Sequence, residues 1–325
     1  MPPIARRLFS TTLPWLQTPA SQACAELSTR FPPSKPLSIR KQTLDANQVH
    51  LLSITLGRSP TSLDPPPEGA PIPPGYHLVY FTPSIAESEL GLDGTDRIVN
   101  PLHSFTRRMW AGGEITWTQD PKSLLRVGQH VQETTRLRSA EPKTLKNGGE
   151  MLVVGVEKTS SNGAGLALVD QRSWVFQAEI TPPGPDLRAL SSTPAPRAFP
   201  EAKYQRDFCQ SATTLFRFSA LTFNAHKIHY LPEWCREVEG HRGAVVHGPL
   251  NLIHMLDFWR DTARGGDMEA LPKSIAYRAM SPLYVGEPYR LLLEDGKDTA
   301  NESGHWKAEI WDNFGKQSMK AKILE

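Results

Sequence analysis

Alternating apolar and polar residues near the C-terminus predict an antiparallel hairpin. The alternation covers residues 306–310 and 319–323, and Asp-Asn-Phe-Gly lies between them at 312–315. Successive side chains of a strand point to opposite faces, so this pattern buries one face only. Asp, Asn and Gly favour tight turns. We therefore expect two strands joined by a turn at 312–315.

A second hairpin is predicted in the first half of the chain. The apolar runs 151–156 and 165–169 flank Asn162-Gly163, and Asn-Gly is a strong hairpin turn signal. Ile115 and Trp117 also alternate with polar neighbours. The two halves of the chain therefore resemble each other. In each half, a segment that contains glycine is followed by segments with the pattern of β-strands.

The segment 250–259 has a different pattern and predicts a buried helix. Its apolar residues would lie on nearly every side of the helix. Pro249 suits the first helical turn, because its missing N–H would have no helical partner there. A buried helix together with antiparallel strands indicates the α+β class. The pattern of residues alone goes no further than this.

Histidines gather around the start of this helix. Five of the ten histidines lie between His226 and His254, and His247 directly precedes Gly248. Histidine exchanges protons near neutral pH, and a helix N-terminus presents free N–H groups and a positive dipole. This combination can move a proton next to a developing oxyanion.

Composition narrows the class of protein. The chain has 325 residues, enough for two ordinary domains, with 36 basic against 34 acidic residues. This near balance gives no electrostatic reason to expect a nucleic-acid partner. Three widely spaced cysteines predict neither a disulfide framework nor a zinc site, and they favour a reducing compartment.

No apolar run is long enough to span a membrane. His226 and His229 alone make a poor metal site, so we expect no metal.

The first residues and a proline-rich segment suggest how the chain is organised. Residues 1–25 contain two arginines, five Ser or Thr and no acid. This composition is typical of a mitochondrial transit peptide, although an ordinary disordered N-terminus would look similar. Six prolines within 182–200 indicate an extended linker. The predicted segments are a transit peptide at 1–25, an N-terminal half at 26–181, a linker at 182–203 and a C-terminal half at 204–325.

Several phrases together resemble one protein family. Residues 221–229 (Leu-Thr-Phe-Asn-Ala-His-Lys-Ile-His) are similar to the MaoC-type hydratase signature, and Val246-His247-Gly248 resembles the later glycine element of that family. The phrases at 73–81, 107–113, 218–224 and 245–250 resemble a narrower group. This group comprises the fungal mitochondrial hydroxyacyl-thioester dehydratases type 2 and the related mesaconyl-CoA hydratases. The similarity runs from about residue 70 to the C-terminus.

The resemblance implies a double hotdog fold, in which two antiparallel sheets each wrap a central helix and the N-terminal copy is degenerate. It implies reversible removal of water from a (3R)-hydroxyacyl thioester to give a trans-2-enoyl thioester, without a cofactor. The substrate would be carried by acyl carrier protein or coenzyme A. In mitochondrial relatives the reaction belongs to type II fatty-acid synthesis, so a matrix location is implied. The protein would be a monomeric double hotdog or a homodimer.

The same resemblance implies the site residues, with some departures from the family signature. His229 occupies the histidine position, Asn224 stands where the family has an acid, and His226 stands where it has Asn. Asn224 can orient water or a hydroxyl but cannot act as a carboxylate. His229 would therefore act alone through water, or His226 would share the task. Gly248 and His247 would bind the thioester and its oxyanion.

Two other functions remain open from the sequence. A hydratase of short dicarboxylyl-CoA esters, such as mesaconyl-CoA, would be favoured by arginine in the acyl pocket, whereas an apolar tunnel would favour fatty acyl chains. The second open function is binding of an acyl thioester without catalysis, because a fold does not determine function. The presence of both His229 and Gly248 argues against the last of these.

Overall fold

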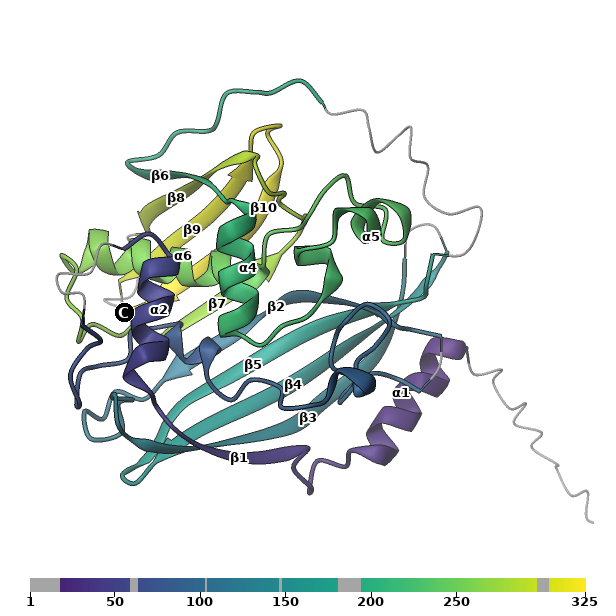
Figure 1. Ribbon diagram of the computed structural model, residues 1–325, viewed down its shortest axis with the longest axis horizontal. Coiled ribbons are helices and arrows are strands. Elements are labelled where there is room, and N and C mark those ends of the chain that lie inside the picture. Colours follow the sequence, from purple (N-terminus) through teal and green to yellow (C-terminus); the bar gives the residue numbers. More distant parts are fainter. Residues whose placement is uncertain (1–17, 59–63, 103, 146–147, 181–193, 297–303) are drawn as a thin grey trace, which may run out of the picture.

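One antiparallel sheet of ten strands runs through the protein (Figure 1). The computed structural model describes residues 18–58, 64–102, 104–145, 148–180, 194–296 and 304–325. The strands are β1 (Ser38–Thr43), β2 (Arg107–Trp117), β3 (His130–Thr144), β4 (Glu150–Asn162), β5 (Gly165–Gln177), β6 (Tyr204–Cys209), β7 (Ser274–Ala279), β8 (Pro288–Gly296), β9 (His305–Asp312) and β10 (Gln317–Leu324).

The sheet consists of two halves with the same strand order. Counted from one edge, the first half runs β1-β3-β4-β5-β2, and counted from the other edge the second half runs β6-β8-β9-β10-β7. The halves meet where β2 pairs with β7, from Gly112 opposite Arg278 to Thr116 opposite Ser274. The similar patterns in the two halves of the sequence therefore reflect a duplicated topology.

The helices differ between the two halves. The helical elements are α1 (Pro19–Arg30), α2 (Ala46–Thr55), η1 (Tyr76–Val79), η2 (Glu87–Glu89), α4 (Ala212–Leu221), η3 (Lys227–His229), α5 (Pro232–Glu237) and α6 (Gly248–Ala263). In the second half, the 16-residue α6 lies between β6 and β7 in the chain. Among the described residues, the corresponding connection in the first half contains α2 and the short helices η1 and η2. The described part of the N-terminal half thus has no equivalent of the long α6.

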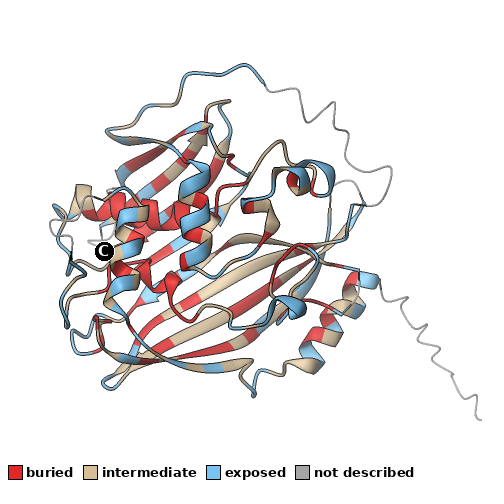
Figure 2. Cartoon of the chain, viewed as in Figure 1, coloured by how far each residue is buried: buried red, intermediate tan, exposed pale blue. Residues whose placement is uncertain are grey.

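The predicted buried helix is confirmed. Every residue from Leu250 to Arg260 is buried, and Pro249 lies in the first turn of α6. Figure 2 shows α6 almost entirely in the colour of buried residues, whereas α2 and α4 each expose one side. A helix that is apolar nearly all round needs cover on every side, and the sheet together with α2 and α4 supplies it.

Both predicted hairpins are confirmed. Strands β9 and β10 pair across a turn in which Asp312 Oδ1 accepts hydrogen bonds from the N–H groups of Phe314 and Lys316. Strands β4 and β5 pair across a turn in which Asn162 Oδ1 accepts from the N–H of Ala164 at 2.9 Å. Burial alternates along β9 as the pattern predicts. Asx side chains that accept from the backbone two residues ahead stabilise such turns.

Helix α1 was not predicted, and it overlaps the predicted end of the transit peptide at residue 25. It begins at Pro19 after the cap residue Thr18, and its Ala20, Cys24 and Leu27 are buried against strands β3 and β4. The predicted segment 1–25 therefore overlaps the first part of a packed helix. Residues 1–17 of that segment, and 182–193 of the predicted linker, lie outside the described residues. In the described part of the chain, no helix has the length and apolarity needed to cross a membrane.

Truncation tests whether α1 is part of the fold. We expect a protein that begins at Thr18 to unfold at the same temperature as the full chain. A protein that begins at Glu26 loses the buried Ala20 and Cys24 and should be less stable by roughly 2–5 kcal/mol, the scale of deleting buried side chains. Thermal and urea unfolding of both truncations measures the difference. Equal stability of the two would contradict this role for α1.

Candidate active site

The segment 222–230, which follows α4 and carries His226 and His229, is called the histidine loop. Local hydrogen bonds hold it in place. At the end of α4, Phe223 adopts a left-handed conformation with φ of 48°, and the N–H of Asn224 donates to the Ser219 carbonyl at 2.8 Å. The side-chain oxygen of Asn224 then accepts from the N–H of His226 at 3.1 Å. The amide nitrogen of Asn224 makes no hydrogen bond to a described residue and remains available as a donor.

His229 and His247 form the centre of the cluster. Their rings stack with centroids 3.5 Å apart and planes 18° from parallel. His229 Nδ1 lies 2.8 Å from the Val245 carbonyl oxygen. A carbonyl only accepts, so the proton of neutral His229 sits on Nδ1. Its Nε2 is therefore unprotonated and can accept a proton. His247 lies directly before α6, and its Nε2 is 2.9 Å from the Ser219 hydroxyl.

His226 lies on the other side of His229 and approaches a carboxylate. The rings of His226 and His229 are perpendicular, with centroids 5.5 Å apart. His226 Nε2 is 3.7 Å from Asp93 Oδ2. Asp93 comes from the N-terminal half, and its backbone carbonyl accepts from the N–H of Lys227 at 2.8 Å. The N-terminal half therefore supplies a carboxylate close to the loop in which Asn224 occupies the family's acidic position.

Gly248 opens α6 beneath an aromatic side chain. A Cβ built at Gly248 would lie 2.3 Å from Cε3 of Trp110, closer than a real contact allows. Trp110 cannot move away freely, because it stacks on Tyr277 with centroids 4.7 Å apart. Glycine is thus required here by the approach of Trp110. Pro249 has no N–H, so the backbone donors without a helical partner at this end of α6 are the N–H groups of His247, Gly248 and Leu250.

Burial keeps these histidines neutral. It lowers the pKa of His229 to about 4, although the hydrogen bond to Val245 opposes the shift. Burial, followed by the neighbouring His229, lowers the pKa of His226 and of His247 well below the ordinary value. Protonation of two stacked imidazoles would place like charges in contact. The cluster is therefore a set of neutral bases and donors near pH 7.

The structure brings together the residues that the sequence singled out: Asn224, His226, His229, His247 and Gly248. It adds three that were not assigned a role, namely Ser219, Asp93 and Trp110. Ser219 and Trp110 lie within phrases that resemble the family, but nothing in the sequence relates Asp93 to the histidine loop. Among the described residues, no group of three or more His, Cys, Asp or Glu side chains is arranged to hold a metal ion.

Known structures share this fold. A MaoC-like dehydratase from Phytophthora capsici aligns with a TM-score of 0.61, 15% identity and coverage of 91% of this chain and 98% of its own. A Mycobacterium tuberculosis protein with a double hotdog fold aligns with a TM-score of 0.55, 14% identity and coverage of 88% and 94%. The protein is a double hotdog of the α+β class, as the resemblance predicted.

The family follows from the sequence comparisons. Residues 75–285 match the family model of hydroxyacyl-thioester dehydratase type 2. Mesaconyl-C(4)-CoA hydratase of Chloroflexus aurantiacus is 30% identical over 243 residues, which cover 72% of this chain and 80% of the relative. The mitochondrial hydroxyacyl-thioester dehydratase type 2 of Schizosaccharomyces pombe is 25% identical, with coverage of 80% and 87%. The chain belongs to the hydroxyacyl-thioester dehydratase type 2 family and is an enzyme of this dehydratase class.

Substitution of Gly248 tests the contact with Trp110. In Gly248→Ala the new Cβ collides with a stacked indole, so we expect a loss of roughly 1–3 kcal/mol in unfolding free energy, as for overpacking. Gly243→Ala is the matched control, because a Cβ at Gly243 meets nothing within 4 Å. Urea unfolding compares the two variants. Equal stability would show that Trp110 is not held against α6.

The buried histidines also predict how stability depends on pH. In the unfolded chain each takes up a proton near pH 6.5, whereas burial lowers the pKa of His229 to about 4 and of His254 to about 3 in the folded protein. Between these values the unfolded state binds more protons, so unfolding free energy must fall as pH drops from 6.5 toward 4. Urea midpoints at pH 8, 6.5 and 5 measure this decline. His254→Gln should make it shallower, and an unchanged midpoint at pH 5 would contradict the expectation.

Proposed function

We propose that this enzyme reversibly dehydrates (3R)-hydroxyacyl thioesters to trans-2-enoyl thioesters. The observation that carries the proposal is the hydrogen bond from His229 Nδ1 to the Val245 carbonyl, which leaves Nε2 as a free base next to the start of α6. Dehydration needs such a base together with a donor for the thioester oxygen. The base and the helix N-terminus lie within one cluster, and the chain belongs to a family of dehydratases.

In the proposed reaction, the proton on C2 is removed and the C3–O bond breaks, so that a C2=C3 double bond forms and water leaves. Negative charge develops on the thioester oxygen as the C2 proton departs. The Gly248 N–H and the positive end of α6 would stabilise this oxygen. A single oxyanion-hole donor typically contributes about 100- to 1,000-fold in rate. His247 at the helix start would help to bind the thioester.

His229 would take the proton through its unprotonated Nε2, directly or through the departing water. The free amide nitrogen of Asn224 would orient the substrate hydroxyl. His226 would share the proton transfer, with the carboxylate of Asp93 favouring its protonated form when a proton arrives. In this scheme Asp93 stabilises His226 from the N-terminal half, while Asn224 acts only through hydrogen bonds.

The cellular setting that we propose is the mitochondrial matrix, with a substrate on acyl carrier protein or coenzyme A in type II fatty-acid synthesis. The composition of residues 1–25 and the mitochondrial designation of the Schizosaccharomyces pombe relative support this. Because α1 begins at Pro19, a processing site before Thr18 would leave the fold intact. The protein would act as a monomeric double hotdog or as a homodimer.

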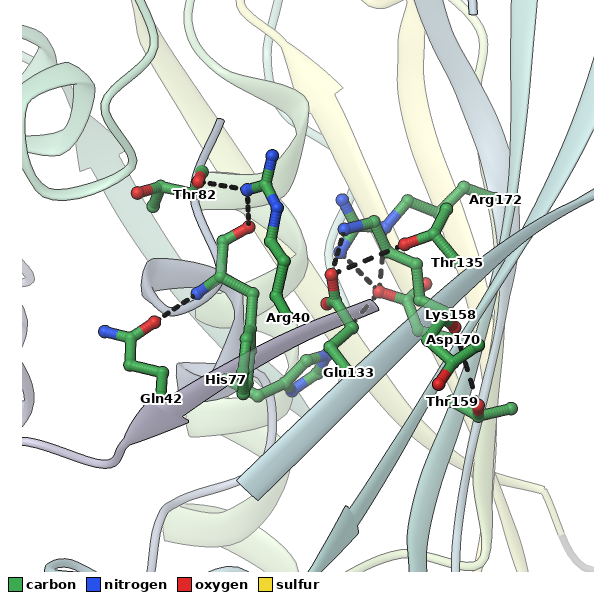
Figure 3. Close-up of polar contacts among 12 residues, drawn as sticks. Arg40, Gln42, His77, Thr82, Glu133, Thr135, Lys158, Thr159, Asp170 and Arg172 are labelled. Carbon is green, nitrogen blue, oxygen red and sulfur yellow. Dashed lines mark hydrogen bonds and ion pairs between the residues drawn. The ribbon is translucent and has the colours of Figure 1, made fainter. Parts of the chain in front are cut away.

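A second candidate is hydration of a short dicarboxylyl-CoA, the type of substrate in the name of the Chloroflexus relative. The half-buried Arg172 on the sheet of the N-terminal half favours it (Figure 3). The two candidates share their chemistry and differ in the acyl group. A third possibility, a binder without activity, is disfavoured by the unprotonated Nε2 of His229.

Hydration of crotonyl-CoA tests the proposed chemistry, because it consumes the absorbance of the conjugated enoyl thioester. We expect wild-type protein to consume it and His229→Gln to lose at least about 100-fold in kcat, the usual contribution of a general base. His254→Gln serves as the control, because His254 is also buried but hydrogen-bonds Gln210 rather than the cluster. Circular dichroism must show both variants folded. A folded His229→Gln enzyme with wild-type turnover would refute the assignment.

A further inference from the structure

A hydrogen bond between Ser219 and His247 joins the end of α4 to the start of α6. Ser219 Oγ lies 2.9 Å from His247 Nε2, and His247 is 1% exposed. The imidazole is held on its faces and edges as well, because it stacks on His229 and meets the ring of Phe218 at 67° with centroids 4.9 Å apart. The orientation of the His247 ring is therefore fixed, and the position of its proton decides what it can do.

Two tautomers of neutral His247 are compatible with this contact. Either the Ser219 hydroxyl donates to a bare Nε2 and the proton lies on Nδ1, or Nε2–H donates to Ser219 and Nδ1 is bare. In the second arrangement the hydroxyl hydrogen of Ser219 would need another acceptor, and Ser219 Oγ makes no other hydrogen bond to a described residue. A buried polar hydrogen without an acceptor is costly. The first arrangement, in which Ser219 donates, avoids this cost.

The start of α6 gives a second reason to place the proton on Nδ1. His247 is the N-cap residue of α6, and the side chain of an N-cap residue normally accepts from a backbone N–H of the first turn. The His247 side chain accepts no such hydrogen bond. A bare Nδ1 could accept from the free N–H of Leu250, whereas a protonated Nδ1 cannot. The missing cap therefore fits an Nδ1–H group.

This Nδ1–H group has no acceptor in the described part of the chain, although Nδ1 is buried. Nδ1 is the ring nitrogen closer to the backbone, so the donor lies near the peptide that joins His247 to Gly248. The N–H of Gly248 is also without a helical partner. Buried donors are rarely left unpaired, and donors at a helix N-terminus favour a negatively charged acceptor. Two donors at this place suit an oxygen on which negative charge develops.

His247 can donate in this way while it stays neutral. Burial, and then the neighbouring His229, lowers its pKa well below the ordinary value. A neutral imidazole is able to polarise a carbonyl as a hydrogen-bond donor. When His229 takes up a proton, a neutral ring stacked on it at 3.5 Å avoids contact between two cations. A donor role for His247 is thus compatible with a base role for His229.

Ser219 is not placed to act as a nucleophile. A serine nucleophile needs a base that a third group orients in turn. No described residue forms a hydrogen bond with His247 Nδ1, so no such group is provided. The direction of the contact, from hydroxyl to imidazole, is that of a group that selects a tautomer.

We propose that Ser219 is a positioning residue that fixes His247 as the Nδ1–H tautomer, and that this N–H is the second donor to the thioester oxygen, beside the N–H of Gly248. The inference rests on the proposed function for the location of the thioester. His247 is then a catalytic residue that keeps its proton throughout the reaction, and Ser219 acts only through it.

Removal of the hydroxyl tests the role of Ser219. Ser219→Ala keeps the backbone carbonyl that accepts from Asn224, and alanine has the higher helix propensity, so the fold should be retained. We expect kcat for crotonyl-CoA to fall at least about tenfold while KM changes less than about twofold, because a misplaced oxyanion donor affects the transition state most. A folded Ser219→Ala enzyme with wild-type kcat overturns the proposal.

Two further variants separate the hydroxyl from general effects on α4. Ser219→Thr keeps a hydroxyl and should retain most of the activity that Ser219→Ala loses. Thr213→Ala removes an exposed hydroxyl from the same helix and should leave kcat unchanged. Circular dichroism and urea unfolding establish that each variant is folded. Loss of activity in Ser219→Thr equal to that in Ser219→Ala would contradict a role for the hydroxyl.

A double-mutant cycle tests whether Ser219 acts through His247. His247→Gln removes the Nδ1 donor and should lower kcat by about 100-fold or more, the usual contribution of one oxyanion donor. In this background Ser219→Ala should change kcat less than about twofold, because the group that it positions is gone. Losses that multiply in the double variant would show that the two residues act independently.

The tautomer itself can be read by nitrogen-15 NMR of protein labelled in histidine, because protonated and bare ring nitrogens have different chemical shifts. The signals of His247 are those that His247→Gln removes. We expect a protonated Nδ1 in the wild-type protein and a loss of this pattern in Ser219→Ala. A protonated Nε2 in the wild-type protein overturns the proposal, whatever the activity.

Addition of butyryl-CoA, a saturated thioester that cannot be hydrated, separates this inference from the proposed function. The Nδ1–H signal of His247 should shift when the thioester oxygen accepts from it. Protein that shows this shift but hydrates no crotonyl-CoA would support the inference and refute the catalytic proposal. Protein that hydrates crotonyl-CoA with the proton of His247 on Nε2 would do the reverse.

Discussion

The pairing of β2 with β7 is the constraint on which the rest of the molecule depends. This ladder joins two halves of equal strand order into one sheet, and it fixes side chains from both halves at one place. Trp110 comes from β2 and Tyr277 from β7, and their stacked rings lie against the start of α6. A shift of one residue in this register would place the two rings on opposite faces of the sheet and break the stack.

The difference between the two halves gives the protein its candidate site. In the C-terminal half α6 fills the sheet, so its N-terminus and the histidine loop are held rigidly by packing. In the described part of the N-terminal half the corresponding connection holds α2 and short 3-10 turns, and charged residues occupy the centre of the sheet. One copy thus supplies the buried histidines and the helix start, while the other supplies Asp93.

Neutral histidines follow from the same packing. His229 and His247 are stacked and buried, so charging either one costs desolvation, and charging both would place like charges in contact. The Val245 carbonyl selects the tautomer of His229. These contacts keep His229 neutral over a wide range of pH, as the proposed base requires, at the cost of stability in acid.

Local patterns in the sequence were sufficient for the hairpins at Asn162 and Asp312, for the buried helix predicted at 250–259, and for the grouping of His226, His229 and His247 with Gly248. These features depend on residues close together in the chain, through turn chemistry and periodicity. Contacts between distant segments determine the packing of helix α1, the approach of Asp93 to His226, and the stacking of Trp110 on Tyr277. No local pattern encodes such contacts. They arise because a duplicated sheet places β2 beside β7 and the two halves share one interior, which only the tertiary structure decides.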